Sequence, residues 1–161
     1  GVTAYNVFVW SPNSVSMPGT EANAMKNYYP GDMYVDWLGV SCYPPSLSAT
    51  YPEERRYPLT LMQGIKQASA DKPIMISEGG YSNTCDHQRW VREWFKLKDE
   101  EPRVKAVVWE NHENAENGDR RLQSDPLALE LYKELVQDPY WLDLIPDAVY
   151  NEIETRKNNS K

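Results

Sequence analysis

The sequence predicts an α/β fold built from about four parallel strand–helix units, which is half of a (β/α)8 TIM barrel. Short apolar runs begin near residues 5, 35, 73 and 104, so they are separated by roughly 30, 38 and 31 residues, the size of one unit. Helical patterns between them favour a parallel sheet with helical cover. A complete barrel needs about 250 residues, whereas this chain has 161. We therefore expect a (β/α)4 domain over residues 1–142 and a C-terminal helix or tail over residues 143–161.

The first half of the chain is predicted to contain two strands. Residues 5–10 are rich in β-branched and aromatic residues and end at a Ser-Pro-Asn turn. The stretch that follows is irregular, with a short helix expected over residues 21–26. Residues 35–43 are typical of a second buried strand, and residues 58–70 carry apolar residues at helical spacing.

The third predicted strand spans residues 73–78 and ends on a carboxylate, Glu78. Its apolar run, Ile-Met-Ile, is typical of a strand buried on both faces, and two glycines directly after Glu78 let the backbone turn away. An acid at the carboxyl end of a buried parallel strand lies where α/β barrels carry their catalytic groups. The alternative interpretation is a solvated acid that only marks the end of the strand.

The second half of the chain alternates in the same way. Residues 85–98 place large apolar side chains on one helical face, and residues 104–109 form a fourth apolar run. A polar loop over residues 110–123 leads to Asp125, which is expected to cap a helix over residues 126–136 that begins with proline.

Composition restricts the classes of partner. The net charge is −7 and no basic stripe is present, which argues against nucleic acid. No apolar run approaches the length that spans a membrane. Six Trp and eleven Tyr are many for this length; aromatic faces can stack on neutral sugars, although large aromatics also simply fill cores. No signal peptide is recognisable, so localisation cannot be inferred from the residues alone.

Acids crowd the loop after the fourth predicted strand: Glu110, Glu113, Glu116 and Asp119. Such clusters are usually solvated, although this loop should border the same cleft as Glu78. Metal ligation by His112 with these acids is an alternative, but we expect no metal and no cofactor. No phosphate-binding loop and no Ser-His-Asp order is found in the sequence. Cys42 and Cys85 are expected near the ends of neighbouring strands, as a disulfide or as two separate thiols.

Four stretches resemble one family of enzymes. Residues 28–40 (YYPGDMYVDWLGV) are similar to the glycoside hydrolase family 26 enzymes, chiefly β-mannanases, within the larger clan (clan A) of retaining glycosidases with (β/α)8 barrels. Residues 9–13 (VWSPN) resemble the end of the fifth barrel strand, residues 72–80 the seventh and residues 107–109 the eighth. The resemblance covers about the first 140 residues, in the family's order, and implies that the chain corresponds to strands five to eight.

The resemblance implies roles for individual residues. Glu78 corresponds to the catalytic nucleophile, Tyr43 to the tyrosine that hydrogen-bonds the nucleophile, and Trp109 to an aromatic sugar platform. A retaining glycosidase uses one ionised carboxylate to attack the anomeric carbon and one protonated carboxyl group to release the leaving oxygen. Further contacts with substrate are expected from three residues near the same cleft: Trp10, Asn13 and His112. For Trp10, filling the core is an equal alternative.

The chain departs from the family pattern in two informative ways. The family's acid/base glutamate lies at the end of the fourth strand, upstream of anything present here, and the pair His112-Glu113 only superficially resembles that site. Ser41 stands where the family often has an aspartate.

The resemblance therefore implies a retaining hydrolase of β-linked polysaccharide, foremost an extracellular endo-β-1,4-mannanase, of which this chain carries the nucleophile half. The missing N-terminal half-barrel or a second copy of the chain is the expected partner. The alternative is a non-catalytic half-barrel, either a fragment, a self-assembling scaffold or a carbohydrate-binding remnant.

Overall fold

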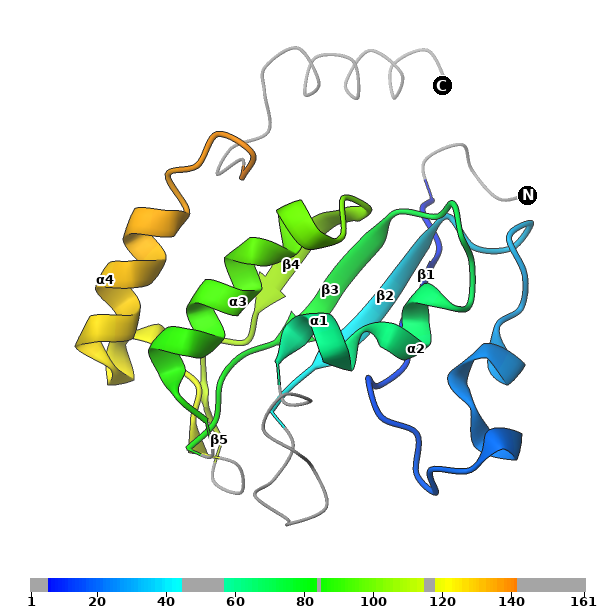
Figure 1. Ribbon diagram of the computed structural model, residues 1–161, viewed down its shortest axis with the longest axis horizontal. Coiled ribbons are helices and arrows are strands. Elements are labelled where there is room, and N and C mark those ends of the chain that lie inside the picture. The colour runs from blue at the N-terminus through cyan, green and yellow to red at the C-terminus, as the bar shows by residue number, and fades with distance from the viewer. Residues whose placement is uncertain (1–5, 45–56, 84, 115–117, 142–161) are drawn as a thin grey trace, which may run out of the picture.

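A four-stranded parallel sheet with helices packed on it forms the centre of the protein (Figure 1). The computed structural model describes residues 6–44, 57–83, 85–114 and 118–141. The helices α1, α2 and α3 lie in front of the sheet in the view of Figure 1, and α4 lies beside α3. The predicted α/β class and the alternation of parallel strands with helices are confirmed.

The four strands pair in the order in which they occur along the chain. They are β1 (Val9–Trp10), β2 (Trp37–Cys42), β3 (Ile74–Gly79) and β4 (Val104–Trp109), and each pairs in parallel with the next. This order, in which each strand lies beside the next one in the sequence, is the order of adjacent strands in a barrel wall. The strands predicted over residues 35–43, 73–78 and 104–109 are therefore confirmed with small shifts at their ends.

The first strand is shorter than predicted. Residues 5–10 were expected to pair throughout, but among those that the structure describes only Val9 and Trp10 form strand. Phe8 is held instead at its backbone: its carbonyl oxygen accepts from the N–H groups of Asp36 and Trp37, and its own N–H donates to the Asp36 carboxylate at 2.9 Å. The Phe8 N–H is thus bonded to the Asp36 side chain, so it is not available for pairing with a backbone carbonyl in a longer strand.

The two long helices follow from their caps and apolar faces. α3 (His87–Glu100) begins after Asp86, whose carboxylate accepts from the Arg89 N–H at 2.9 Å. α4 (Pro126–Leu135) begins after Asp125 as predicted, with the Leu127 and Ala128 N–H groups donating to the Asp125 carboxylate. α3 turns a fully buried face toward the sheet: Trp90, Val91, Trp94, Phe95 and Leu97.

Two predicted helices are broken into shorter turns. Residues 58–70 form α1 (Pro58–Leu61) and α2 (Gln63–Lys66), which are separate short helices. Gly64 lies in the second, where the Met25 side chain packs so closely that a Cβ would come within 3.1 Å of its terminal methyl; glycine also weakens a helix by about 1 kcal/mol relative to alanine. The helix predicted over residues 21–26 is a pair of 3-10 turns: η1 (Glu21–Asn23) and η2 (Met25–Tyr28).

The polar loop predicted over residues 110–123 has structure of its own. It contains an antiparallel pair, β5 (Glu113–Asn114) with β6 (Gly118–Asp119), followed by the 3-10 turn η4 (Leu122–Ser124). Cys42 and Cys85 are separate thiols rather than a disulfide. The helix or tail predicted over residues 143–161 lies outside the described residues.

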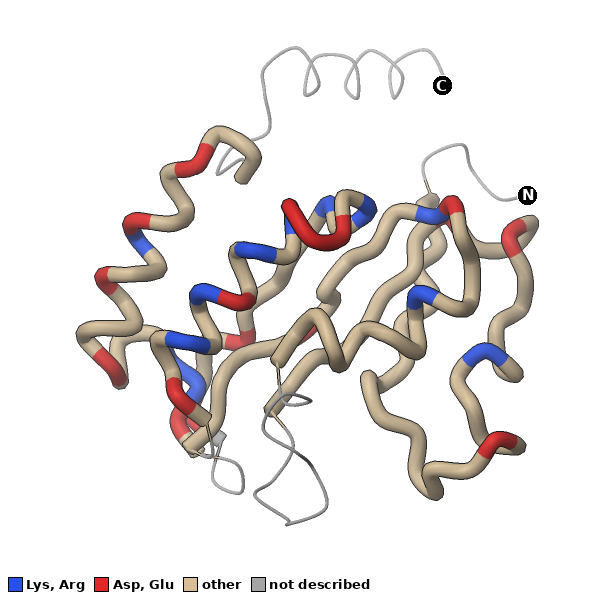
Figure 2. Tube along the Cα trace, viewed as in Figure 1, with Lys and Arg blue, Asp and Glu red and all other residues tan. Residues whose placement is uncertain are grey.

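Charge lies on the helices and loops rather than on the sheet (Figure 2). Within the four parallel strands the charged residues are Glu78 and Lys105. Acidic and basic side chains both occur along α3 and along α4. None of the described helices is both long enough and apolar enough to cross a membrane.

A glycine in β2 lets two serines meet across the sheet. The Ser11 hydroxyl lies 2.5 Å from the Ser77 hydroxyl, which comes from β3. A Cβ on Gly39, in the strand between them, would lie 2.7 Å from the Ser11 Cβ and 2.8 Å from its hydroxyl. The missing side chain at Gly39 is therefore what allows this contact between strands that are not neighbours.

We expect Gly39→Ala to destabilise the protein by about 1–3 kcal/mol, because the added methyl group must displace Ser11 in a packed region. Urea unfolding followed by circular dichroism measures the change. Gly80→Ala is the matched control, since a Cβ there meets its nearest atom at an ordinary 3.5 Å. Equal unfolding midpoints for Gly39→Ala and the parent would contradict the proposed close contact.

Candidate active site

The ends of β2 and β3 bring two predicted site residues into contact. Ser41 and Cys42 of β2 lie opposite Glu78 and Gly79 of β3, and Tyr43 follows directly after β2. The Tyr43 hydroxyl donates a hydrogen bond of 2.5 Å to Glu78 Oε1. Glu78 is exposed and Tyr43 is half-buried, so the carboxylate is reachable from solvent while its donor is held by the protein.

The backbone that carries Glu78 is fixed by packing directly after it. A Cβ on Gly79 would lie 2.4 Å from Cη2 of Trp94 and 2.5 Å from the Cys42 carbonyl oxygen. Only glycine fits between α3 and the end of β2 at this point. The need for glycine at Gly79 is therefore a packing requirement.

A second carboxylate lies beside the same tyrosine. Glu110 follows β4 directly and its backbone N–H donates to the Gly79 carbonyl at 2.8 Å. Its Oε1 is 3.1 Å from His112 Nδ1, and its Oε2 is paired with Nη1 of Arg120. Glu110 was expected to be one of several solvated loop acids. The structure shows instead that it is half-buried and paired.

Arg120 completes the cluster, and nothing in the sequence pointed to it. Its side chain is buried, with 6% of the residue exposed. Its guanidinium carbon lies 3.9 Å from the centroid of the Tyr43 ring, a cation–π contact. The other loop acids are placed differently: Asp119 pairs with Arg121, Glu113 is exposed, and Glu116 lies outside the described residues.

These surroundings keep the Tyr43 phenol protonated. Its pKa is raised, first because burial disfavours the phenolate, and then because hydrogen bonds to Glu110 and Glu78 and the negative charges of both carboxylates disfavour it further. Tyr43 is thus a neutral donor beside two acids, and its hydroxyl proton is directed to Glu78.

Trp109 is anchored from three sides. Its ring contacts Tyr81, Trp94 and Tyr132 at centroid distances of 5.2, 5.4 and 5.9 Å, and its Nε1 donates to the Arg120 carbonyl at 3.0 Å. The residue is half-buried. The indole N–H is therefore occupied, and any contact with a sugar would use the exposed part of the ring.

The remaining predicted residues lie on either side of the Glu78–Tyr43 pair. Asn13 is exposed and bridges to Ser41, the residue opposite Glu78. Trp10 is half-buried, packs on Tyr29 at 5.0 Å, and lines with Asn13 a hollow of about 200 Å³. Trp10 therefore partly fills the core and partly lines a depression. His112 is exposed and reaches Glu110 rather than Glu78.

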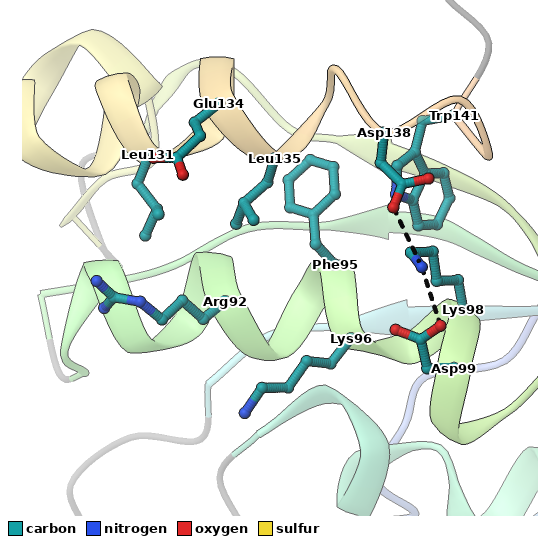
Figure 3. A pocket seen from close by; sticks show the side chains of 10 residues that line it. All are labelled: Arg92, Phe95, Lys96, Lys98, Asp99, Leu131, Glu134, Leu135, Asp138 and Trp141. Carbon is teal, nitrogen blue, oxygen red and sulfur yellow. Dashed lines mark hydrogen bonds and ion pairs between the residues drawn. The ribbon is translucent and has the colours of Figure 1, made fainter.

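A groove of about 560 Å³ lies elsewhere, between α3 and α4 (Figure 3). Arg92 and Lys98 line it from α3, and Leu131 and Glu134 line it from α4. Lys98 bridges Asp99 at 2.9 Å and Asp138 at 3.2 Å there. The groove is formed by the helices, not by the ends of the strands, so it is separate from the candidate site. Across the described ranges, no three His, Cys, Asp or Glu side chains gather in a way that could hold a metal ion.

Comparison with known proteins relates this fold to polysaccharide hydrolases. No protein-family model matches the chain. It is 31% identical over 113 residues to Endoglucanase H of Acetivibrio thermocellus, which covers 68% of this chain and 12% of that protein. The chain thus spans about an eighth of that relative.

Solved mannanase structures share the fold. A Cellulomonas fimi endo-β-1,4-mannanase double mutant superposes with a TM-score of 0.51 at 20% identity, covering 84% of this chain and 31% of that one. A modular endo-β-1,4-mannanase from Cellulomonas fimi, described as a glycoside hydrolase family 26 enzyme, superposes with a TM-score of 0.51 at 20% identity, covering 83% of this chain and 31% of that one. The resemblance to family 26 is confirmed at the level of fold: the chain has the architecture of part of a mannanase TIM barrel.

Spectrophotometric titration tests the environment of Tyr43. We expect the tyrosinate absorbance of the folded chain and of Tyr43→Phe to coincide through the ordinary range of tyrosine, about pH 10, because Tyr43 stays protonated. In concentrated guanidinium chloride, where the chain is unfolded and Tyr43 is exposed, the tyrosinate absorbance of the two proteins should differ by that of one tyrosine. A one-tyrosine difference near pH 10 in the folded state would show that Tyr43 is neither buried nor close to two carboxylates.

Proposed function

We propose that this chain is half of the catalytic barrel of a retaining glycoside hydrolase related to family 26, and that the complete barrel cleaves a β-linked polysaccharide, with β-1,4-mannan as the first choice. The observation that carries the proposal is the 2.5 Å hydrogen bond from Tyr43 to Glu78 at the ends of adjacent parallel strands. The mannanase fold and the identity with an endoglucanase support the same class of reaction.

In this proposal Glu78 is the nucleophile. It is exposed at the carboxyl end of β3, where a substrate can reach it. Tyr43 donates to Oε1, which leaves Oε2 of Glu78 to attack the anomeric carbon. The bond breaks between that carbon and the leaving oxygen, and a glycosyl–enzyme ester forms until water hydrolyses it with overall retention.

The residues around Glu78 suit an uncharged sugar. Trp109 would offer the exposed part of its ring as a stacking platform, and Trp10 with Asn13 would offer a ring edge and an amide on the other side of the pair. His112 would contact substrate from the β4 side, where it is exposed beside Glu110.

The proton donor for the leaving oxygen is proposed to come from the other half of the barrel. Glu110 does not suit this role, because both of its oxygens accept from cations or from the ring of His112. This observation also favours a second candidate for the chain by itself, a carbohydrate-binding half-barrel without turnover. We propose, from the resemblance to family 26, that the protein works outside the cell.

The sheet itself indicates the need for a partner. β1 and β4 are its outer strands, and apolar side chains beside them are open to solvent: Val7 is 61%, Phe8 50% and Val108 48% exposed. Outer strands present unpaired backbone groups that pair readily with another strand. We propose that the missing half-barrel, or a second copy of this chain, covers these edges.

Substitution of Glu78 tests the proposed reaction. In the complete barrel, Glu78→Ala should lower the release of reducing sugar from mannan by more than about 10³-fold, since no covalent intermediate can form. Azide should restore cleavage of an activated aryl mannoside and yield the α-azide, because the small anion occupies the place of the carboxylate. Glu113→Ala, an exposed acid in the neighbouring hairpin, is the control and should keep full activity.

Activity retained in Glu78→Ala would refute the assignment of the nucleophile. Mixed-linkage glucan assayed in parallel distinguishes the sugar. With the 161-residue chain alone, binding to mannan without release of reducing sugar would select the carbohydrate-binding alternative.

The oligomeric state of the isolated chain tests the proposal that a partner covers the edges of the sheet. We expect sedimentation velocity to show association that increases with concentration, and Val108→Lys to shift the chain toward monomer, because a lysine on an edge strand opposes pairing. Leu127→Lys, at a position 66% exposed on α4, should leave association unchanged. A chain that is monomeric at every concentration would contradict the proposal that its edges need a partner.

A further inference from the structure

The Tyr43 hydroxyl can donate one hydrogen bond, and two carboxylates lie near enough to compete for it. Glu78 accepts it at 2.5 Å, and Glu110 is close enough that a hydrogen bond to it also raises the Tyr43 pKa. A phenol donates only one hydrogen bond at a time. If the proton turned to Glu110, Glu78 would lose the donor that holds its orientation.

Cationic and ring N–H groups occupy Glu110. Nη1 of Arg120 pairs with its Oε2, and Nδ1 of His112 lies 3.1 Å from its Oε1. Arg120 is buried while His112 is 54% exposed at its side chain, so the arginine provides the less screened of the two interactions. With its charge balanced in this way, Glu110 competes less strongly for the Tyr43 proton.

The same arginine fixes the plane of the tyrosine ring. Its guanidinium carbon lies 3.9 Å from the ring centroid, so the planar group covers one face of the ring. Its backbone is tied to the end of β4, because its N–H donates to the His112 carbonyl at 3.1 Å and its carbonyl accepts from Trp109 Nε1 at 3.0 Å. The β5–β6 pair thus returns the chain so that Arg120 lies over the strand ends.

We propose that Arg120 is a positioning residue, which holds Glu110 and the ring of Tyr43 so that the Tyr43 hydroxyl donates to Glu78. The catalytic meaning of this arrangement rests on the proposed function, but the arrangement of hydrogen bonds does not. Arg120 reaches Glu78 only through Tyr43.

Crystal structures of two variants of the 161-residue chain decide the inference. In Arg120→Met, Oε2 of Glu110 loses its buried partner while His112 still faces Oε1. The Tyr43 hydroxyl should then leave Glu78, with the oxygen–oxygen distance rising beyond about 3.5 Å, and turn to Glu110. In the double variant Glu110→Gln/Arg120→Met the competing charge is gone, and the bond to Glu78 should return. Arg121→Met is the matched control, since Arg121 pairs with Asp119 and should leave the bond unchanged.

Three outcomes would overturn the inference: Tyr43 still bonded to Glu78 in Arg120→Met, no return in the double variant, or the same loss in Arg121→Met. Arg120→Met could fail to fold, and two other variants then decide the proposal. The double variant leaves no unpaired buried charge, and Arg120→Lys keeps the cation. Both must retain the Tyr43–Glu78 bond, and loss of the bond in either refutes the proposal.

Kinetics in the complete barrel provide an independent readout. Arg120→Met should lower kcat on mannan about tenfold or more, because the nucleophile loses a hydrogen bond to a charged group and the free energy of such a bond corresponds to a rate change of this size. KM should change by less than about twofold, because only the orientation of the nucleophile changes. Glu110→Gln should restore the rate. A barrel without any activity on mannan would refute the proposed function, while the distances in the variants would still decide the role of Arg120.

Discussion

The packing of Trp94 beneath Gly79 is the constraint on which the strand ends depend. The indole comes from α3 and leaves no space for even one methyl group between the helix, β3 and the Cys42 carbonyl. The end of β3 is therefore held against the end of β2, and Glu78 and Tyr43 leave their strands within hydrogen-bonding distance. Trp94 also contacts Trp109 at 5.4 Å, so one buried side chain sets the positions of all three strand ends. The packing of a large aromatic side chain in the core thus helps to position the side chains at the ends of the strands.

The features that could be predicted from the sequence are those that depend on neighbouring residues. Asp125 and Pro126 specify where α4 begins, and the apolar runs of β2, β3 and β4 specify buried strands, whatever the rest of the chain does. The carboxyl ends of adjacent parallel strands meet at one edge of the sheet, which brings the ends of β2 and β3 together. The hydrogen bond between Tyr43 and Glu78, however, was expected only from the resemblance to family 26.

The features that could not be predicted depend on contacts between distant residues. The helix expected over residues 58–70 is instead two short helices that separate at Met62, and the second contains Gly64, against which Met25, far away in the chain, packs. Arg120 gave no signal because its position over Tyr43 requires the β5–β6 pair, whose sequence is polar and has no strong strand pattern. Glu110 could have been found, since it follows β4 as closely as Glu78 ends β3, but as one acid among several it resembled a solvated loop.

Two carboxylates near one point repel each other. Here a neutral phenol lies beside both acids, and a guanidinium pairs with one of them. Because burial and both acids raise the Tyr43 pKa, the phenol keeps its proton and remains a hydrogen-bond donor. Glu78 keeps an exposed oxygen, while Glu110 is confined by Arg120 and His112. The two acids therefore differ in their partners: Glu78 accepts from Tyr43 at Oε1, whereas both oxygens of Glu110 are taken by Arg120 and His112.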